Sequence, residues 1–187
     1  MQIILASQSL FRRKALDLLS LQYSVVPSNF DEKSIRHSDP LELAKMLSEA
    51  KALAIGKIHE NSLVIAADLF VTFNNEVFEK PANNEEAIEM LRTFSGNKVE
   101  IICGLAVFNS ETGKMLSATD TCAIKFRELV DSEIQDYVSR YPVTKFAGSF
   151  DSDGVIRFAE EINGTSFQFG LPVNKLIYFL RENGVKV

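Results

Sequence analysis

The sequence predicts an α/β fold with one mixed, twisted sheet, long antiparallel hairpins and flanking helices. Short apolar, β-branched runs alternate with segments whose apolar residues recur at helical spacing. Two pairs of strand-like runs are joined by turn residues, Asn74-Asn75 and Glu111-Thr112-Gly113, which is typical of hairpins. The 187 residues, 46% of them hydrophobic, suffice for the core of one domain spanning residues 1–187. Because hairpins combine with strand–helix alternation, a mixed sheet is favoured over a doubly wound parallel one.

The first part of the chain predicts three strands and two helices. The strands are expected at residues 3–6, 23–27 and 63–67, the helices at about 9–19 and 40–58, and a polar loop at 28–38. Asp39, with Glu42 three residues later and Pro40 at the first helical position, indicates the start of the second helix. The apolar residues expected on its buried face are Leu43, Leu47, Ala50, Ala54 and Ile58.

The remainder predicts hairpins and three more helices. Helices are expected at 85–94, at 132–139 and from about 172 to 184, and strands at 99–108 and 115–126. Gly96 lies in the C-cap position of the first of these helices, and Gly184 ends the last. The Gly- and Ser-rich stretch 148–154 is expected to form a turn that leads to a short strand.

Charge and composition exclude several classes of protein. A net charge of −5 argues against nucleic-acid and anionic-membrane binding, which need a broad positive surface. The apolar run at residues 1–6 is short and lacks basic residues, so we expect no signal peptide, no membrane partner and a cytoplasmic location. Cys103 and Cys122 lie in apolar runs without C-x-x-C spacing, which favours reduced core thiols over zinc ligands, while a disulfide stays open.

The segment from Ser7 to Arg13 is a candidate anion site. A strand that runs into a helix offers unpaired backbone N–H groups and the positive end of the helix dipole. Two hydroxyls and the guanidiniums of Arg12 and Arg13 suit a phosphate chain. The alternative is that Ser9 only caps the helix and the arginines are solvated.

Carboxylates and lysines supply further candidates. Asp31 and Glu32 lie in a polar loop, where they either hold a hard divalent cation or form a solvated turn. Asp68 directly follows an apolar run, so it lies either at the ligand-binding end of a strand or at the start of a turn. Lys51 and Lys80 are ordinary cations when taken separately, but an acidic protein that binds a triphosphate needs local cations and a metal.

Together these motifs resemble the Maf-like family of nucleoside triphosphate pyrophosphatases along nearly the whole chain. The resemblance rests on Ile4–Ser9 with Arg12-Arg13, and on Asp31-Glu32, Lys51, Ala67-Asp68, Lys80-Pro81, Ser95-Gly96, Gly104 and Gly170-Leu171-Pro172. It implies an inosine-triphosphate-pyrophosphatase-like fold with a cleft between two lobes. It also implies Mg²⁺- or Mn²⁺-dependent hydrolysis of the α–β phosphate bond of a nucleoside triphosphate, and a homodimer.

The resemblance also implies roles for individual residues. Asp68, Lys51 and Lys80 would be catalytic, with Asp68 orienting or deprotonating the attacking water. Glu32 and Asp68 would hold the metal. The substrate-binding residues would be Ser7, Arg12, Arg13 and Ser149.

One segment indicates a branch of the family. Residues 137–154 resemble the members that hydrolyse 7-methyl-GTP, and Asp151 or Asp153 would supply a carboxylate for the positively charged base. Departures from the family pattern occur at Leu69, where a polar residue is usual, at Glu79 and at Thr165-Ser166. Two alternatives remain: a dTTP/UTP pyrophosphatase, and a nucleotide-binding regulator of division or septum formation with little turnover.

Overall fold

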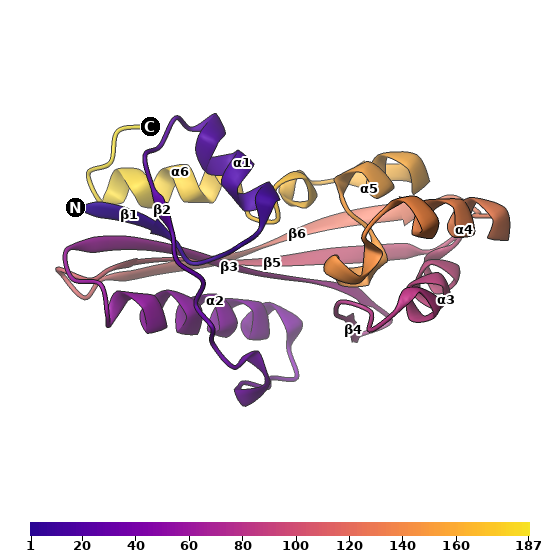
Figure 1. The fold of residues 1–187 in the computed structure, drawn as a ribbon, viewed down its shortest axis with the longest axis horizontal. Coiled ribbons are helices and arrows are strands. Elements are labelled where there is room, and N and C mark those ends of the chain that lie inside the picture. Colours follow the sequence, from indigo (N-terminus) through magenta and orange to yellow (C-terminus); the bar gives the residue numbers. More distant parts are fainter. The chain divides into compact units, whose positions relative to one another are not determined.

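The computed structural model describes residues 1–187, with seven strands in one mixed sheet (Figure 1). The strands are β1 (Gln2–Leu5), β2 (Ser24–Val25), β3 (Ser62–Phe73), β4 (Glu76–Phe78), β5 (Lys98–Asn109), β6 (Met115–Phe126) and β7 (Ala159–Asn163). Their order is β2-β1-β3-β5-β6-β7, with β4 also paired to β3. Because β1 is parallel to β2 and β3 while β3–β4 and β6–β7 are antiparallel, the predicted mixed α/β sheet is confirmed.

Six α-helices accompany the strands. They are α1 (Leu10–Leu18), α2 (Pro40–Gly56), α3 (Asn84–Phe94), α4 (Asp131–Arg140), α5 (Ser152–Phe158) and α6 (Val173–Glu182). Ser9 caps α1 by accepting from the Arg12 N–H, and Asp39 caps α2 by accepting from the Leu41 N–H. Gly96 follows α3 with a φ of 67°, as a residue at that end of a helix requires. No helix combines the length and the apolar character that a membrane crossing requires.

The chain divides into two compact units, each made of separate segments. Unit 1 contains Met1–Leu69, Cys103–Asp120 and Gln168–Val187, and unit 2 contains Phe70–Ile102 and Thr121–Phe167. The three long strands β3, β5 and β6 contribute residues to both units. The single domain and the cleft between lobes that the sequence suggested stay predictions.

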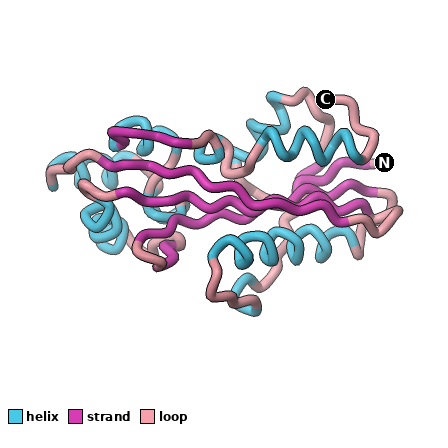
Figure 2. The backbone as a smooth tube through the Cα atoms, turned by 180° about the vertical axis from the view of Figure 1, so that it is seen from behind, coloured by secondary structure: helices cyan, strands magenta, loops and turns pink.

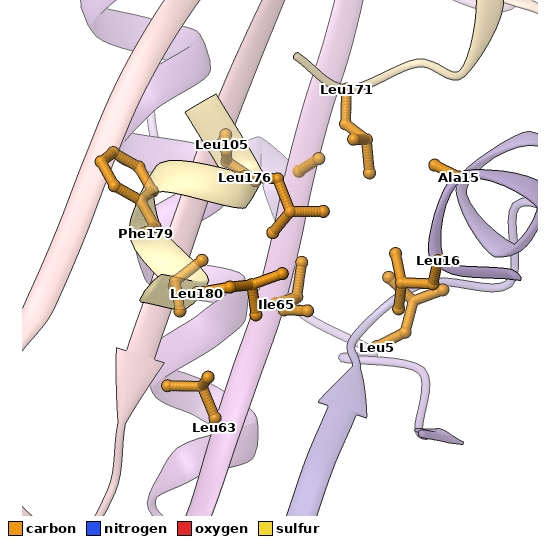
Figure 3. Packing of buried hydrophobic residues seen from close by; sticks show 12 residues of the cluster. Leu5, Ala15, Leu16, Leu63, Ile65, Leu105, Leu171, Leu176, Phe179 and Leu180 are labelled. Carbon is orange, nitrogen blue, oxygen red and sulfur yellow. The ribbon is translucent and has the colours of Figure 1, made fainter. Parts of the chain in front are cut away.

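The core of unit 1 lies on both faces of its strands, with helices over each (Figure 2). Successive strand residues point to opposite faces, so Leu63 and Ile65 pack with residues of α1 and α6, whereas Val64 and Ala66 pack with residues of α2. Figure 3 shows the first of these clusters, in which the side chains of α1, α6, β1, β3 and β5 meet. This alternation decides which helix each side chain at the site faces.

The core of unit 2 is aromatic. The Phe94 ring of α3 contacts four other phenylalanine rings, with centroids 4.9–6.3 Å away: Phe73, Phe78, Phe126 and Phe150. Most of these pairs meet edge to face, the arrangement that ring quadrupoles favour. The many phenylalanines of the sequence are therefore explained in part by this cluster.

Several predicted elements differ from the structure. Only Leu47 of the five residues expected on the buried face of α2 is buried, and Ile58 lies beyond the helix with 71% of its surface exposed. The buried face is instead made by Ala44, Leu47, Ser48, Lys51, Ala52 and Ile55. The predicted turn at 148–154 contains the start of α5, because Asp151 accepts from the Gly154 N–H and caps a helix. The predicted strand at 23–27 is reduced to the two residues of β2.

Candidate active site

Asp68 lies within β3 rather than at its end, which corrects the prediction of a strand that stops before it. β3 continues to Phe73, where its last residues pair with β4, and Asp68 is buried. It has the same orientation along the strand as Val64 and Ala66, so its side chain points to the α2 face. A buried carboxylate in a strand needs a partner, and α2 supplies one.

The partner is the Lys51 ammonium, which joins two carboxylates. Its Nζ lies 2.5 Å from Oδ1 of Asp68 and 2.8 Å from Oε1 of Glu32. The side chains of Lys51 and Asp68 are each 8% exposed, whereas that of Glu32 is 57% exposed. The structure therefore brings together three of the predicted site residues, with Glu32 on the solvent side.

A close approach between α2 and β5 helps to place Lys51. A Cβ at Gly104 would lie 2.1 Å from the carbonyl oxygen of Ala44, so no other residue fits there without moving the backbone. Glycine at this position lets α2 lie against the sheet, with Lys51 two turns further along its buried face. The close contact between α2 and β5 thus explains why glycine occurs at position 104.

Asp31 and Glu32 take different roles. Asp31 accepts from the Lys33 N–H at 3.1 Å and caps the single 3₁₀ turn Glu32–Ser34. Glu32 is the residue that reaches Lys51. The solvated turn considered for this loop is therefore realised by Asp31, and the metal-binding role of Glu32 stays a prediction.

Arg12 is held by groups from the two ends of the chain. Its Nε donates to the Gly170 carbonyl at 3.0 Å, and its Nη1 donates to Ser7 Oγ at 3.0 Å. Burial lowers the pKa of Arg12, while the negative charges of Asp68 and Glu32 act in the opposite direction. Arginine is still a cation at neutral pH. Arg12 therefore lies within electrostatic reach of the Lys51 cluster.

Arg13 adds an unfilled donor. Its Nε is the one buried side-chain nitrogen or oxygen atom that has no hydrogen-bond partner. Buried polar groups without partners are rare in folded proteins, and an anion would satisfy this one. The predicted alternative, in which both arginines are simply solvated, does not describe Arg12 or the Arg13 Nε.

Lys80 and Ser149 belong to unit 2. Lys80 is exposed and forms no ion pair. Ser149 is fully buried, and its hydroxyl donates to Sδ of Met90 at 3.1 Å, so this geometry gives it a packing role. Asp151 is occupied as the cap of α5 and as the partner of the Tyr137 hydroxyl at 2.9 Å. The predicted functional roles of Lys80 and Ser149 stay predictions.

A comparison with protein families matches residues 2–183 to the model for "Maf-like protein". The chain belongs to the Maf-like family. It is 35% identical over 188 residues to a 7-methyl-GTP pyrophosphatase of Pseudoalteromonas translucida, covering 99% of this chain and 93% of the relative. It is 36% identical over 191 residues to a dTTP/UTP pyrophosphatase of Clostridium botulinum, covering 99% of this chain and 98% of that relative. The predicted family is confirmed.

Solved structures support the fold. A HAM1 protein from Coxiella burnetii superposes with a TM-score of 0.55 at 16% identity, covering 97% of this chain and 99% of that one. The Ham1 protein of Staphylococcus aureus superposes with a TM-score of 0.52, also at 16% identity, and the match covers 98% of this chain and all of that one. The predicted inosine-triphosphate-pyrophosphatase-like fold is thereby confirmed.

Gly170 is the site residue for which the sequence indicated no chemical role. The resemblance to the Maf-like family included Gly170-Leu171-Pro172, but not the acceptance of a hydrogen bond from Arg12. Its φ of 64° is a conformation that glycine adopts without strain, so the glycine itself was the only signal that the sequence offered. Leu69 lies nearby, with Cδ1 3.7 Å from where a Cβ of Gly170 would be, and is partly exposed.

The carboxylates of this Maf-like chain fit a divalent cation that is shared with a ligand. One oxygen of Glu32 and one of Asp68 lie within 2.8 Å of the same atom, Nζ of Lys51, and carboxylate oxygen is what Mg²⁺ and Mn²⁺ prefer. The structure contains no cluster of three or more His, Cys, Asp or Glu residues that would enclose a metal. Mg²⁺ is commonly held by one or two carboxylates, with water and phosphate oxygens as the other ligands.

Proposed function

We propose that this chain is a nucleoside triphosphate pyrophosphatase, which hydrolyses the bond between the α and β phosphates and releases a nucleoside monophosphate and pyrophosphate. The observation that carries the proposal is the Lys51 ammonium between Asp68 and Glu32, with Arg12 in electrostatic reach. The names of the curated relatives, which cover almost the whole chain, support the same reaction.

Asp68 is proposed to orient or deprotonate the attacking water. Its Oδ1 carries the contact with Lys51, which leaves Oδ2 to accept the proton of a water molecule. Its low exposure keeps bulk water away from the carboxylate. Lys51 holds Asp68 in place before the nucleotide binds, and its ammonium would then offset negative charge that develops on the transferred phosphoryl group.

Arg12 and Arg13 are proposed to bind the phosphate groups of the nucleotide. Arg12, positioned by Ser7 and Gly170, and Arg13, with its unfilled Nε, provide guanidinium donors that match phosphate oxygens. Lys80 of unit 2 would supply a further cation. Mg²⁺ or Mn²⁺ held by Glu32 and Asp68 would, when bound, neutralise charge on the phosphate oxygens.

The preferred substrate is proposed to be 7-methyl-GTP. The resemblance of residues 137–154 to that branch supports this choice, as do the relatives of that name at 35–36% identity. A second candidate is dTTP or UTP, because relatives named dTTP/UTP pyrophosphatase are just as similar. We further propose a cytoplasmic location and a homodimer, the latter measurable by light scattering.

The test is pyrophosphate release with Mg²⁺ or Mn²⁺ against a panel that includes 7-methyl-GTP, GTP, dTTP and UTP. Asp68→Asn should abolish release, while Glu60→Gln, the corresponding change at an exposed carboxylate, should leave it intact. Turnover of pyrimidine nucleotides alone would keep the reaction and reject the purine assignment. Nucleotide binding without release from any substrate would reject the enzyme and favour a nucleotide-binding regulator.

A further inference from the structure

The Lys51 ammonium contacts both of the carboxylates that would hold a bridging cation. Its distances of 2.5 Å to Asp68 Oδ1 and 2.8 Å to Glu32 Oε1 mean that these two oxygens are at most 5.3 Å apart, the sum of the two. A cation that uses the same oxygens has bonds of about 2.1 Å to them. It would therefore lie within about 5 Å of Nζ if Lys51 did not move.

Two positive ions at that separation repel each other strongly in this environment. The Lys51 and Asp68 side chains are each only 8% exposed, so water screens the repulsion poorly. Lysine has a flexible stem of four methylene groups, which allows its ammonium to move to another anion. A cation and Lys51 thus exclude each other at this carboxylate pair unless Lys51 turns away.

The formal charges of the cluster also indicate that a divalent cation and Lys51 do not share Asp68 and Glu32 in the absence of nucleotide. Lys51 and Arg12 carry two positive charges, and Asp68 and Glu32 carry two negative ones, so the cluster is already neutral. A divalent cation alone would leave two positive charges in a poorly hydrated place, which is unfavourable. A triphosphate supplies close to four negative charges, which accommodate both the cation and the displaced ammonium.

We propose that Lys51 competes with the divalent cation for Glu32 and Asp68. This inference rests on the proposed function. The protein without nucleotide binds the cation weakly, because Lys51 already neutralises the carboxylates. The nucleotide brings phosphate oxygens that receive the Lys51 ammonium, and the carboxylates then become available to the cation. Lys51 is in this sense an internal counter-ion that links cation binding to the arrival of the triphosphate.

The test is Mn²⁺ binding in the absence of nucleotide, measured from the electron paramagnetic resonance signal of unbound Mn²⁺. Lys51→Met should bind Mn²⁺ roughly ten-fold more tightly than the unmodified protein, or better, since it removes the competing charge. Lys45→Met is the matched control on α2, because Lys45 is a partly exposed lysine that pairs only with Glu42, at 3.7 Å. It should leave Mn²⁺ binding unchanged.

Two further variants keep the test decisive. Lys51→Gln removes the charge but keeps an amide donor for one carboxylate, so it replaces Lys51→Met if thermal unfolding shows that the latter does not fold. Adding Glu32→Gln to either variant should reverse the gain in affinity. Equal or weaker Mn²⁺ binding by the Lys51 variants, or no binding by any protein up to millimolar Mn²⁺, would overturn the competition.

The proposed function is judged separately, by pyrophosphate release from the unmodified protein. Release together with unchanged Mn²⁺ affinity in the Lys51 variants would reject the competition and keep the reaction. No release from any nucleotide, together with a ten-fold gain in Mn²⁺ affinity, would reject the reaction and keep the competition.

Discussion

The guanidinium of Arg12 and the carbonyl of Gly170 are joined by a hydrogen bond of 3.0 Å, although 158 positions separate them in the sequence. A second bond, from Nη1 to Ser7 Oγ, fixes the guanidinium plane. With Nε and Nη1 held by the protein, Nη2 is left to donate to a ligand. The C-terminal segment thus takes part in the site through its main chain, while Arg12 supplies the charge.

Arg12→Lys tests this arrangement. Lysine keeps the positive charge but lacks the planar fork, so it cannot make both bonds and also face a phosphate. We expect kcat/KM for pyrophosphate release to fall roughly 10- to 100-fold, the value of one hydrogen bond to a charged group. Lys14→Gln, at an exposed position of the same helix, should change it less than two-fold. Equal kcat/KM values for the two variants would contradict the assigned role of Arg12.

Gly104→Ala should loosen the contact between α2 and β5. The added Cβ would meet the Ala44 carbonyl at 2.1 Å, and a backbone group cannot move aside without shifting the helix. We expect the free energy of unfolding to fall by about 3 kcal/mol. Because α2 carries Lys51, activity should fall as well, measured on protein that is folded at the assay temperature.

Gly113→Ala is the control for that substitution. A Cβ added at Gly113 would meet nothing within 4 Å, but the φ of this residue is 73°. Alanine there should cost about 1 kcal/mol through backbone strain alone and leave activity unchanged. If both alanine variants lost the same stability, close packing would not be the reason for glycine at position 104.

The sequence indicated correctly where α2 begins, but the face that it predicted to be buried was mostly wrong. Alanine, leucine and isoleucine occur around much of its circumference, so several faces satisfy the helical period. The true buried face includes Lys51, a residue that a hydrophobic pattern places in solvent. Its burial is favourable only because Asp68 lies opposite, and that pairing joins residues 17 positions apart on different elements.

Local sequence patterns also failed to predict the place of Asp68 within β3 and the start of α5. A carboxylate after an apolar run indicates the end of a strand, since a charge inside a buried strand is unfavourable without a partner. Gly154 is typical of a turn, yet it lies in α5, where a Cβ would come within 2.5 Å of the Tyr137 hydroxyl. Both features are determined by tertiary contacts. Local signals such as Ser9, Asp39 and Gly96, by contrast, predicted their helix ends well.

The ion pair between Arg127 and Glu133 should make stability depend on pH. Hydrogen bonds from Arg127 lower the pKa of Glu133 below its ordinary value of 4.5, so the pair stabilises the fold above that pH and loses its effect as the pH falls through the lowered value. Glu133→Gln should therefore lower the melting temperature at pH 7, and the difference from the unmodified protein should close below pH 4.5. Glu60→Gln, at an exposed position, should show no such trend. A difference that persisted unchanged at low pH would mean that the charge of Glu133 is not its cause.

Ser149→Ala separates a packing role from substrate binding. The hydroxyl is fully buried and donates to Met90 Sδ, so alanine should lower the free energy of unfolding by about 1 kcal/mol and leave the KM and kcat of pyrophosphate release within two-fold. Ser149→Gly is a useful companion, because Ser149 has a φ of 69° and glycine relieves about 1 kcal/mol of backbone strain while losing the same hydroxyl. Its stability should lie close to that of the unmodified protein. If KM instead rose ten-fold or more in both variants while both stayed folded, the hydroxyl would have to reach the nucleotide, which requires unit 2 to rearrange around Ser149 when the substrate binds.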